Sequence, residues 1–166
     1  SNVLIKKPQG DYDPLTFYQK NQQWENIKHA AMITAPAVVF HELAHKFTAM
    51  FFGAQATLHA PYGWYMIIIL LKMMNFPLLF FVGGYVTHTP LPALPSALVA
   101  ISGIATNIAL WLAAKACVQY KLVHQKWYSI LIPLGKINLF LAIFNMIPIP
   151  GFDGANAVRS IIQAIQ

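Results

Sequence analysis

This chain of 166 residues is long enough for one domain, but 57% of its residues are hydrophobic and only 10% are charged, with a mean hydropathy of +0.53. Soluble domains carry about 25% charged residues, so the composition excludes an ordinary soluble domain and predicts a multi-pass integral membrane protein. The formal charge of +6 comes from scattered basic residues without a basic stripe. This pattern argues against nucleic-acid binding and favours contact with a lipid bilayer.

Residues 1–29 form the polar part of the chain. They contain four lysines and three of the five acidic residues. Aromatic side chains such as Trp24 suit the headgroup region of a bilayer. We therefore expect a loop that leads into an interfacial helix, followed by a membrane-embedded core over residues 30–166.

Three apolar stretches predict membrane-spanning helices, because about 20 apolar residues are needed to cross a bilayer. These stretches cover about residues 30–52, 95–118 and 127–147. Gly53 is expected to cap the first helix, and Pro148 ends the third. Residues 155–165 predict a short C-terminal helix.

Residues 64–88 do not fit a regular spanning helix. Lys72 and Pro77 interrupt the apolar run, and aromatic and β-branched residues surround Gly83 and Gly84. This pattern predicts a re-entrant or small β-containing segment. The predicted fold class is therefore an all-α polytopic membrane protein with a three-helix transmembrane core and this one irregular insertion.

The sequence HELAH, from His41 to His45, has the pattern of a metal site. Residues four apart lie on the same face of a helix, so both imidazoles can reach one metal ion. Glu42 follows the first histidine, where its carboxylate can take a proton from a metal-activated water. A histidine pair that only bonds two helices together is the alternative, but ionisable groups at bilayer depth are functional by default.

A catalytic zinc ion takes three protein ligands and a water. Asp153 is the only carboxylate after Glu42, and the prolines and glycines of its segment NMIPIPGFDG free the backbone to turn a side chain inward. Asp153 is therefore the predicted third ligand. Weaker candidates lie in connecting segments, and they are His59, His88 and His124.

These motifs resemble those of the site-2 protease family of intramembrane zinc metalloproteases. That family pairs His-Glu-x-x-His in one transmembrane helix with Asn-x-x-Pro-x-x-x-x-Asp-Gly in a later one. The second motif is matched by Asn145, Pro148, Asp153 and Gly154. A Gly-x-x-x-Asn pattern in the helix between them is matched by Gly103 and Asn107. The resemblance covers about residues 30–160.

The resemblance implies an intramembrane zinc endopeptidase with one zinc ion per chain, which cleaves transmembrane segments of protein substrates (regulated intramembrane proteolysis). The resemblance implies that His41, His45 and Asp153 bind the metal. It implies that Glu42 is the general base, and that the amides of Asn145 and Asn107 bind the substrate. Two alternatives stay open. One is a zinc peptidase that acts on peptides at the membrane interface, and the other is a catalytically silent metal-binding membrane protein.

The predicted zinc site also constrains the topology. His45 lies in the second half of the first helix and Asp153 lies just beyond the end of the last one. They can meet only if these two helices run in the same direction, which requires an odd number of crossings. We therefore expect residues 64–82 to be re-entrant or surface-bound rather than a full crossing.

Overall fold

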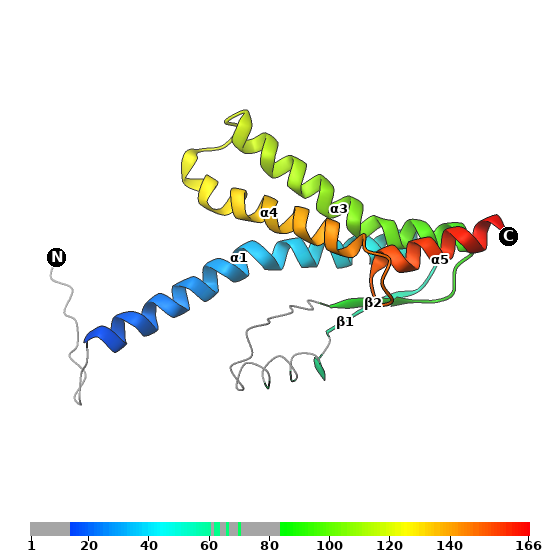
Figure 1. Ribbon diagram of the computed structural model, residues 1–166, viewed down its shortest axis with the longest axis horizontal. Coiled ribbons are helices and arrows are strands. Elements are labelled where there is room, and N and C mark those ends of the chain that lie inside the picture. The colour runs from blue at the N-terminus through cyan, green and yellow to red at the C-terminus, as the bar shows by residue number, and fades with distance from the viewer. Residues whose placement is uncertain (1–13, 61, 64–65, 67–69, 71–83) are drawn as a thin grey trace. The chain divides into compact units, whose positions relative to one another are not determined.

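The computed structural model describes residues 14–60, 62–63, 66, 70 and 84–166. In chain order the elements are α1 (Pro14–Phe51), β1 (Ala56–His59), β2 (Tyr85–His88), α3 (Ala93–Gln119), the 3-10 turn η1 (Gln125–Trp127), α4 (Tyr128–Asn145) and α5 (Asp153–Ile165) (Figure 1). The chain divides into two compact units, Ser1–Met32 and Ile33–Gln166. The second unit contains the second half of α1 and all later elements.

α1 is longer than the sequence predicts. It begins at Pro14 rather than near residue 30 and continues through Pro36. Proline is favoured in the first helical turn because its φ angle is preset, and the glutamines, lysines and glutamate that follow are good helix formers. The expected interfacial helix and the expected first core helix are therefore one continuous helix.

The end of α1 is the one predicted. Gly53 has a φ of +82°, and its N–H donates to the Met50 carbonyl at 2.9 Å, while the Ala54 N–H donates to the Ala49 carbonyl at 3.0 Å. These two bonds form a Schellman motif, which favours glycine because the backbone is left-handed at this position. The turn directs the chain from α1 into β1.

The helices α3 and α4 lie within two residues of their predicted bounds, 95–118 and 127–147. Within the part of the chain that is described, these are the two helices long and apolar enough to cross a membrane. α1 does not belong to this group, because the ionisable residues near its C-terminal end lower its hydropathy. α5 begins at Asp153, two residues before the predicted start.

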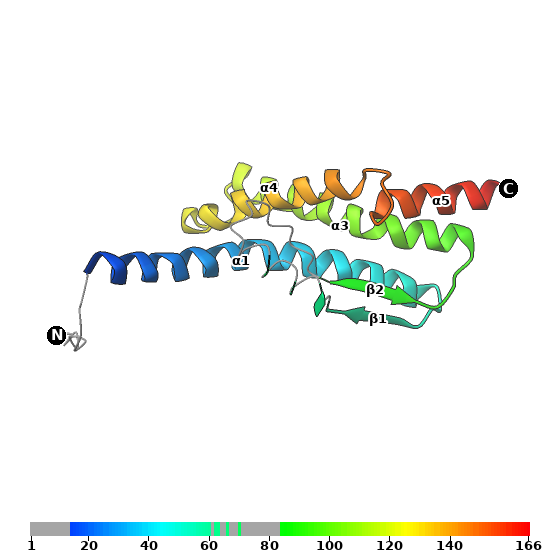
Figure 2. The same ribbon diagram turned by 60° about the horizontal axis from the view of Figure 1, so that its bottom comes forward.

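β1 and β2 pair in a small antiparallel sheet, with Ala56 opposite His88 and His59 opposite Tyr85. β2 falls in the segment that was predicted to contain β structure, whereas β1 was not predicted. The predicted re-entrant segment, residues 64–82, lies outside the described residues except for positions 66 and 70. Figure 2 shows this two-stranded sheet on one side of the second half of α1, with α3, α4 and α5 on the other side.

Small residues fill the interior of the second unit, whereas many large apolar side chains point outward. Seven of the buried alanines are Ala37, Ala49, Ala97, Ala100, Ala114, Ala142 and Ala157. Exposed large residues on the helices include Phe40, Phe47, Leu98, Leu112, Ile132, Phe140 and Ile143. Helix interfaces made of small residues, with apolar surfaces outside, are typical of membrane proteins.

Hydrogen bonds fix the direction of α3 against α1. The His45 ring contacts the Val99 carbonyl, and the His41 ring contacts Asn107 further along α3. The order is reversed on the two helices, so α3 runs antiparallel to the second half of α1. α4 returns along α3 after a short connection (Figure 1). α4 therefore runs in the same direction as α1, as the predicted zinc site requires.

Candidate metal centre

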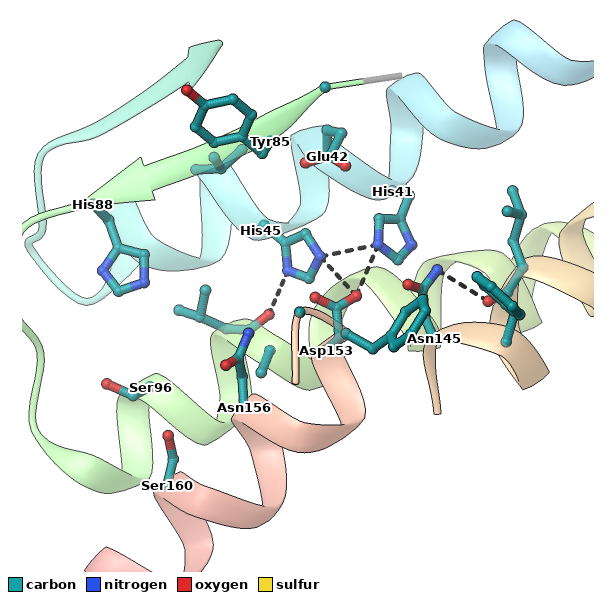
Figure 3. A pocket seen from close by; sticks show the side chains of 18 of the residues that line it. His41, Glu42, His45, Tyr85, His88, Ser96, Asn145, Asp153, Asn156 and Ser160 are labelled. Atoms are coloured by element: carbon teal, nitrogen blue, oxygen red, sulfur yellow. Dashed lines mark hydrogen bonds and ion pairs between the residues drawn. The ribbon is translucent and has the colours of Figure 1, made fainter. Parts of the chain in front are cut away.

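Three side chains from α1 and α5 meet at one point (Figure 3). Asp153 Oδ2 lies 2.9 Å from His41 Nε2 and 3.2 Å from His45 Nε2. The two Nε2 atoms are 3.1 Å apart. The structure thus brings together the three predicted ligands across more than a hundred residues of sequence.

This triangle fits a small divalent metal ion. Ligands at about 2.0–2.1 Å from a tetrahedral zinc ion lie roughly 3.3–3.4 Å from one another. The observed separations of 2.9–3.2 Å are smaller by only a few tenths of an ångström. Among the described residues, this is the one group of three or more potential ligands close enough to share an ion.

His45 is set up to bind through Nε2. Its side chain is buried in the α1–α3 interface, and Nδ1 lies 2.7 Å from the Val99 carbonyl oxygen. A carbonyl can only accept, so Nδ1 carries the proton and donates it. The lone pair is therefore left on Nε2, the atom that faces His41 and Asp153.

His41 has a side-chain partner in place of a carbonyl. Asn107 is 0% exposed, and its Nδ2 lies 3.1 Å from His41 Nδ1, while its own Oδ1 has no hydrogen-bond partner within the described residues. A metal-binding Nε2 requires a proton on Nδ1, which needs an acceptor. Turning the amide by 180° supplies that acceptor, since the two ends of the amide have the same shape.

Asp153 is carried into the site by the start of α5. It is the acidic residue in the first turn of that helix, where the helix dipole favours a negative charge. Asp153 therefore presents a carboxylate.

Two glycines allow the backbone to approach closely at this point. A Cβ atom at Gly103 would lie 2.6 Å from His41 Cε1 and would also clash with His45 Nε2, so α3 can pass behind the two imidazoles only without a side chain there. A Cβ atom at Gly154 would clash with the Met146 carbonyl at the end of α4. The glycine after Asp153 thus lets the first turn of α5 lie close to the end of α4, while α5 itself packs along α3.

Glu42 is half-buried and lies on the side of the histidines that faces β2, opposite Asp153 (Figure 3). A Cβ atom at Gly84 would lie 3.7 Å from Glu42 Cγ, so the chain that enters β2 passes directly beside the glutamate. Glu42 lines the same cleft as His41 and His45, so its carboxylate can reach a water molecule beside them.

A cleft of about 1000 Å³ opens onto these side chains. Asn145 lines it, and its Nδ2 donates to the Leu141 carbonyl at 3.0 Å. The cleft has an apolar part and a polar part. Apolar lining comes from Val38, Leu141, Phe144, Pro150 and Phe152, and polar lining comes from His88, Ser96, Asn156, Arg159 and Ser160.

The polar part of the cleft and the Val99 carbonyl were not predicted from the sequence. α5 carries Asn156, Arg159 and Ser160 with a spacing of three and one, which places them near one helix face. That spacing is the only sequence signal for them. A backbone carbonyl leaves no signal in the sequence.

The weaker histidine candidates have other partners. His59 Nε2 lies 2.8 Å from Thr87 Oγ1, and His88 Nδ1 donates to the Thr89 carbonyl at 2.9 Å. His124 accepts a bond from the Lys126 N–H. His88 lines the cleft, but it is not part of the His41–His45–Asp153 group.

Comparisons with known proteins agree with this geometry. The sequence profile described as Peptidase family M50 matches residues 114–166. A protein of Methanocaldococcus jannaschii, which bears the provisional name of a zinc metalloprotease, is 33% identical over 123 residues. That match covers 73% of this chain and 64% of the relative, so the chain spans less than two thirds of the relative's length. No solved structure matches.

Gly103→Ala tests the close approach of α3. We expect the added methyl group to displace both imidazoles and to lower zinc affinity by at least about tenfold, as lost ligand orientation does elsewhere. Zinc content of the purified protein, measured by elemental analysis, checks this result. Gly135→Ala is the matched control, because its Cβ would meet only Ala114 Cβ and Trp111, at 3.3 Å and beyond. Full zinc content in Gly103→Ala would contradict the packing.

Substitutions at Asn107 test the proton on His41 Nδ1. Asn107→Leu removes the acceptor, so we expect zinc affinity to fall about 10- to 100-fold. Asn107→Asp keeps an acceptor and removes the donor, so its affinity should stay close to that of the unmodified protein. Competition with a chromogenic chelator measures both affinities. Equal losses in the two variants would show that the amide donor is what His41 needs.

Proposed function

We propose that this chain is a member of the site-2 protease family and a membrane-embedded zinc endopeptidase, a proposal that its motifs and both sequence matches support. The observation that carries the proposal is the triangle of His41, His45 and Asp153 with Glu42 beside it. A site that merely stores metal needs no general base, whereas Glu42 lines the same cleft as the three ligands. The name of the M. jannaschii relative supports zinc as the metal.

The protein would hold zinc through His41 Nε2, His45 Nε2 and an Asp153 carboxylate oxygen. A bound zinc ion supplies polarisation of the scissile carbonyl and a lowered pKa for the attacking water. Glu42 takes the proton from that water and then delivers it to the nitrogen of the leaving amine. The Val99 carbonyl and Asn107 hold the Nδ1 protons of the two histidines, so both rings keep their orientation during proton transfer.

The substrate is a segment of another membrane protein, and the bond cleaved lies in or near its transmembrane part. The apolar part of the cleft, with Leu141, Phe144 and Phe152, suits apolar side chains of such a segment. An intact helix hides its carbonyls in internal hydrogen bonds, so the substrate unwinds locally before attack. Asn145 lines the cleft beside Asp153 and is placed to bond the unwound backbone.

α1, α3 and α4 form the membrane-embedded core in this proposal. α3 and α4 are apolar enough to span by themselves. The second half of α1 has outward-facing apolar residues such as Phe40 and Phe47, while its two histidines are turned inward against α3. The two histidines are thus covered by protein, which is the condition for ionisable groups at bilayer depth.

Glu42→Gln tests the general base. We expect the variant to bind zinc normally, because Glu42 is not a ligand, and to lose cleavage of a transmembrane peptide by about 10²- to 10⁴-fold, which is the usual worth of general acid–base catalysis. Glu25→Gln, the other glutamate of the chain, serves as the control. Unchanged cleavage by a zinc-loaded Glu42→Gln protein would refute the mechanism. Cleavage of soluble peptides alone by the unmodified protein would favour an interfacial peptidase.

Asp153→Ala tests the third ligand. Removal of the carboxylate should leave two histidine ligands, so we expect zinc stoichiometry to fall well below one per chain after dialysis against a weak chelator. The fold should survive, because Asp153 is only partly buried at the start of α5. Normal stoichiometry would instead direct attention to His88, the other histidine that lines the cleft.

A further inference from the structure

The end of the α3–α4 hairpin far from the metal centre carries a concentrated positive charge. Its lysines are Lys115, Lys121, Lys126 and Lys136. Residues 93–152 contain no aspartate or glutamate at all, so this charge has no carboxylate nearby in the sequence. Within the described part of the chain, none of these four lysines forms an ion pair, and Asp153 in the metal centre pairs with His41 and His45.

Two of these lysines share a pocket between the helices. Its volume is about 320 Å³, and Lys115 from α3 and Lys136 from α4 both line it. Gly135 and Ala114 also line the pocket and pack closely together. A Cβ atom added at Gly135 would lie 3.3 Å from the Ala114 Cβ. The remaining lining is mostly apolar and includes Val118, Leu131 and Ile132.

The opposite directions of α3 and α4 bring the ammonium groups of Lys115 and Lys136 toward the same distance from the connected end of the two helices. Lys115 lies four residues before the end of α3 and Lys136 lies eight residues after the start of α4, about 6 Å and 12 Å from the connected end. Side chains lean toward the N-terminus of their helix. Lys115 therefore leans away from the connected end and Lys136 leans toward it, so both point into the space between them.

Aromatic residues mark this end as a membrane interface. Tyr120 and Trp127 are 70% and 50% exposed, and such side chains prefer the headgroup level of a bilayer. Lys115 Nζ lies 5.7 Å from the Trp111 ring centroid, which restricts its position beside the pocket. Lys136 is exposed on the surface of α4, so its ammonium group can face a lipid headgroup beside the pocket.

We propose that this pocket, lined by Lys115 and Lys136, binds the phosphate headgroup of an anionic phospholipid, with the acyl chains along the apolar groove between α3 and α4. The inference rests on the proposed membrane location of these helices and not on proteolysis. A phosphate is the ligand that two ammonium groups in an apolar pocket without carboxylates would recognise.

The test is native mass spectrometry of the full-length protein released from nanodiscs of mixed phosphatidylglycerol and phosphatidylcholine. We expect the unmodified protein to retain phosphatidylglycerol selectively. The double variant Lys115→Met/Lys136→Met keeps the apolar stems and removes both charges, so its selectivity should fall by roughly 30-fold. Lys121→Gln/Lys126→Gln removes the same charge at the same end, outside the pocket, and should retain the lipid.

Equal losses in the pocket and control variants would overturn the proposal, because general surface charge would then explain the selectivity. Inorganic phosphate is the second probe, and displacement of the lipid by millimolar phosphate alone would also overturn it in favour of a free anion site. Unchanged zinc content in each variant verifies folding, since the pocket is remote from Gly103 in α3. Failure of α3 and α4 to insert into membranes would refute the proposed location itself, which is a distinguishable result.

Discussion

The whole arrangement depends on the meeting of three atoms, His41 Nε2, His45 Nε2 and Asp153 Oδ2, within 3.2 Å of one another. Two of them come from one helix turn, but the third is held 108 residues further on. Such a meeting requires α3 to run back along α1 and α4 to return. It also requires a bare backbone at Gly103, because any side chain there would occupy the space of the ligand atoms.

The same constraint explains why the interior is built from small residues. Helices that pass behind a pair of imidazoles must approach closely, and alanine and glycine permit this approach. The large apolar side chains are then left for the outside, where Phe40, Leu112 and Phe140 are half exposed or more. In water this surface would be a severe liability, whereas a bilayer solvates it. Close packing around the candidate metal centre and an apolar exterior are thus two consequences of one geometry.

The sequence was sufficient to predict what depends on spacing. HELAH places two candidate ligands within one helix turn, and the scarcity of carboxylates after Glu42 leaves Asp153 as the candidate for the third ligand. Helix bounds for α3 and α4 followed from apolar length. The contacts that orient the ligands could not be predicted, since the Val99 carbonyl is chemically identical to every other carbonyl. β1 was missed because four residues without alternation carry no periodic signal, and the early start of α1 was missed because polar helix formers resemble a loop in composition.

Asn107 is a residue that the sequence correctly placed near the site but to which it assigned a different role from the one its contacts favour. The resemblance suggested a substrate-binding amide, but a side chain with no exposed surface and a 3.1 Å contact to His41 is better suited to orienting a ligand. The net charge of the whole site also favours this orienting role for Asn107. With a divalent cation bound, two neutral imidazoles and the carboxylates of Glu42 and Asp153 would bring the site to zero net charge. An apolar surrounding tolerates such a neutral group far better than two uncompensated carboxylates, so the amide that keeps His41 neutral and correctly turned also keeps the balance.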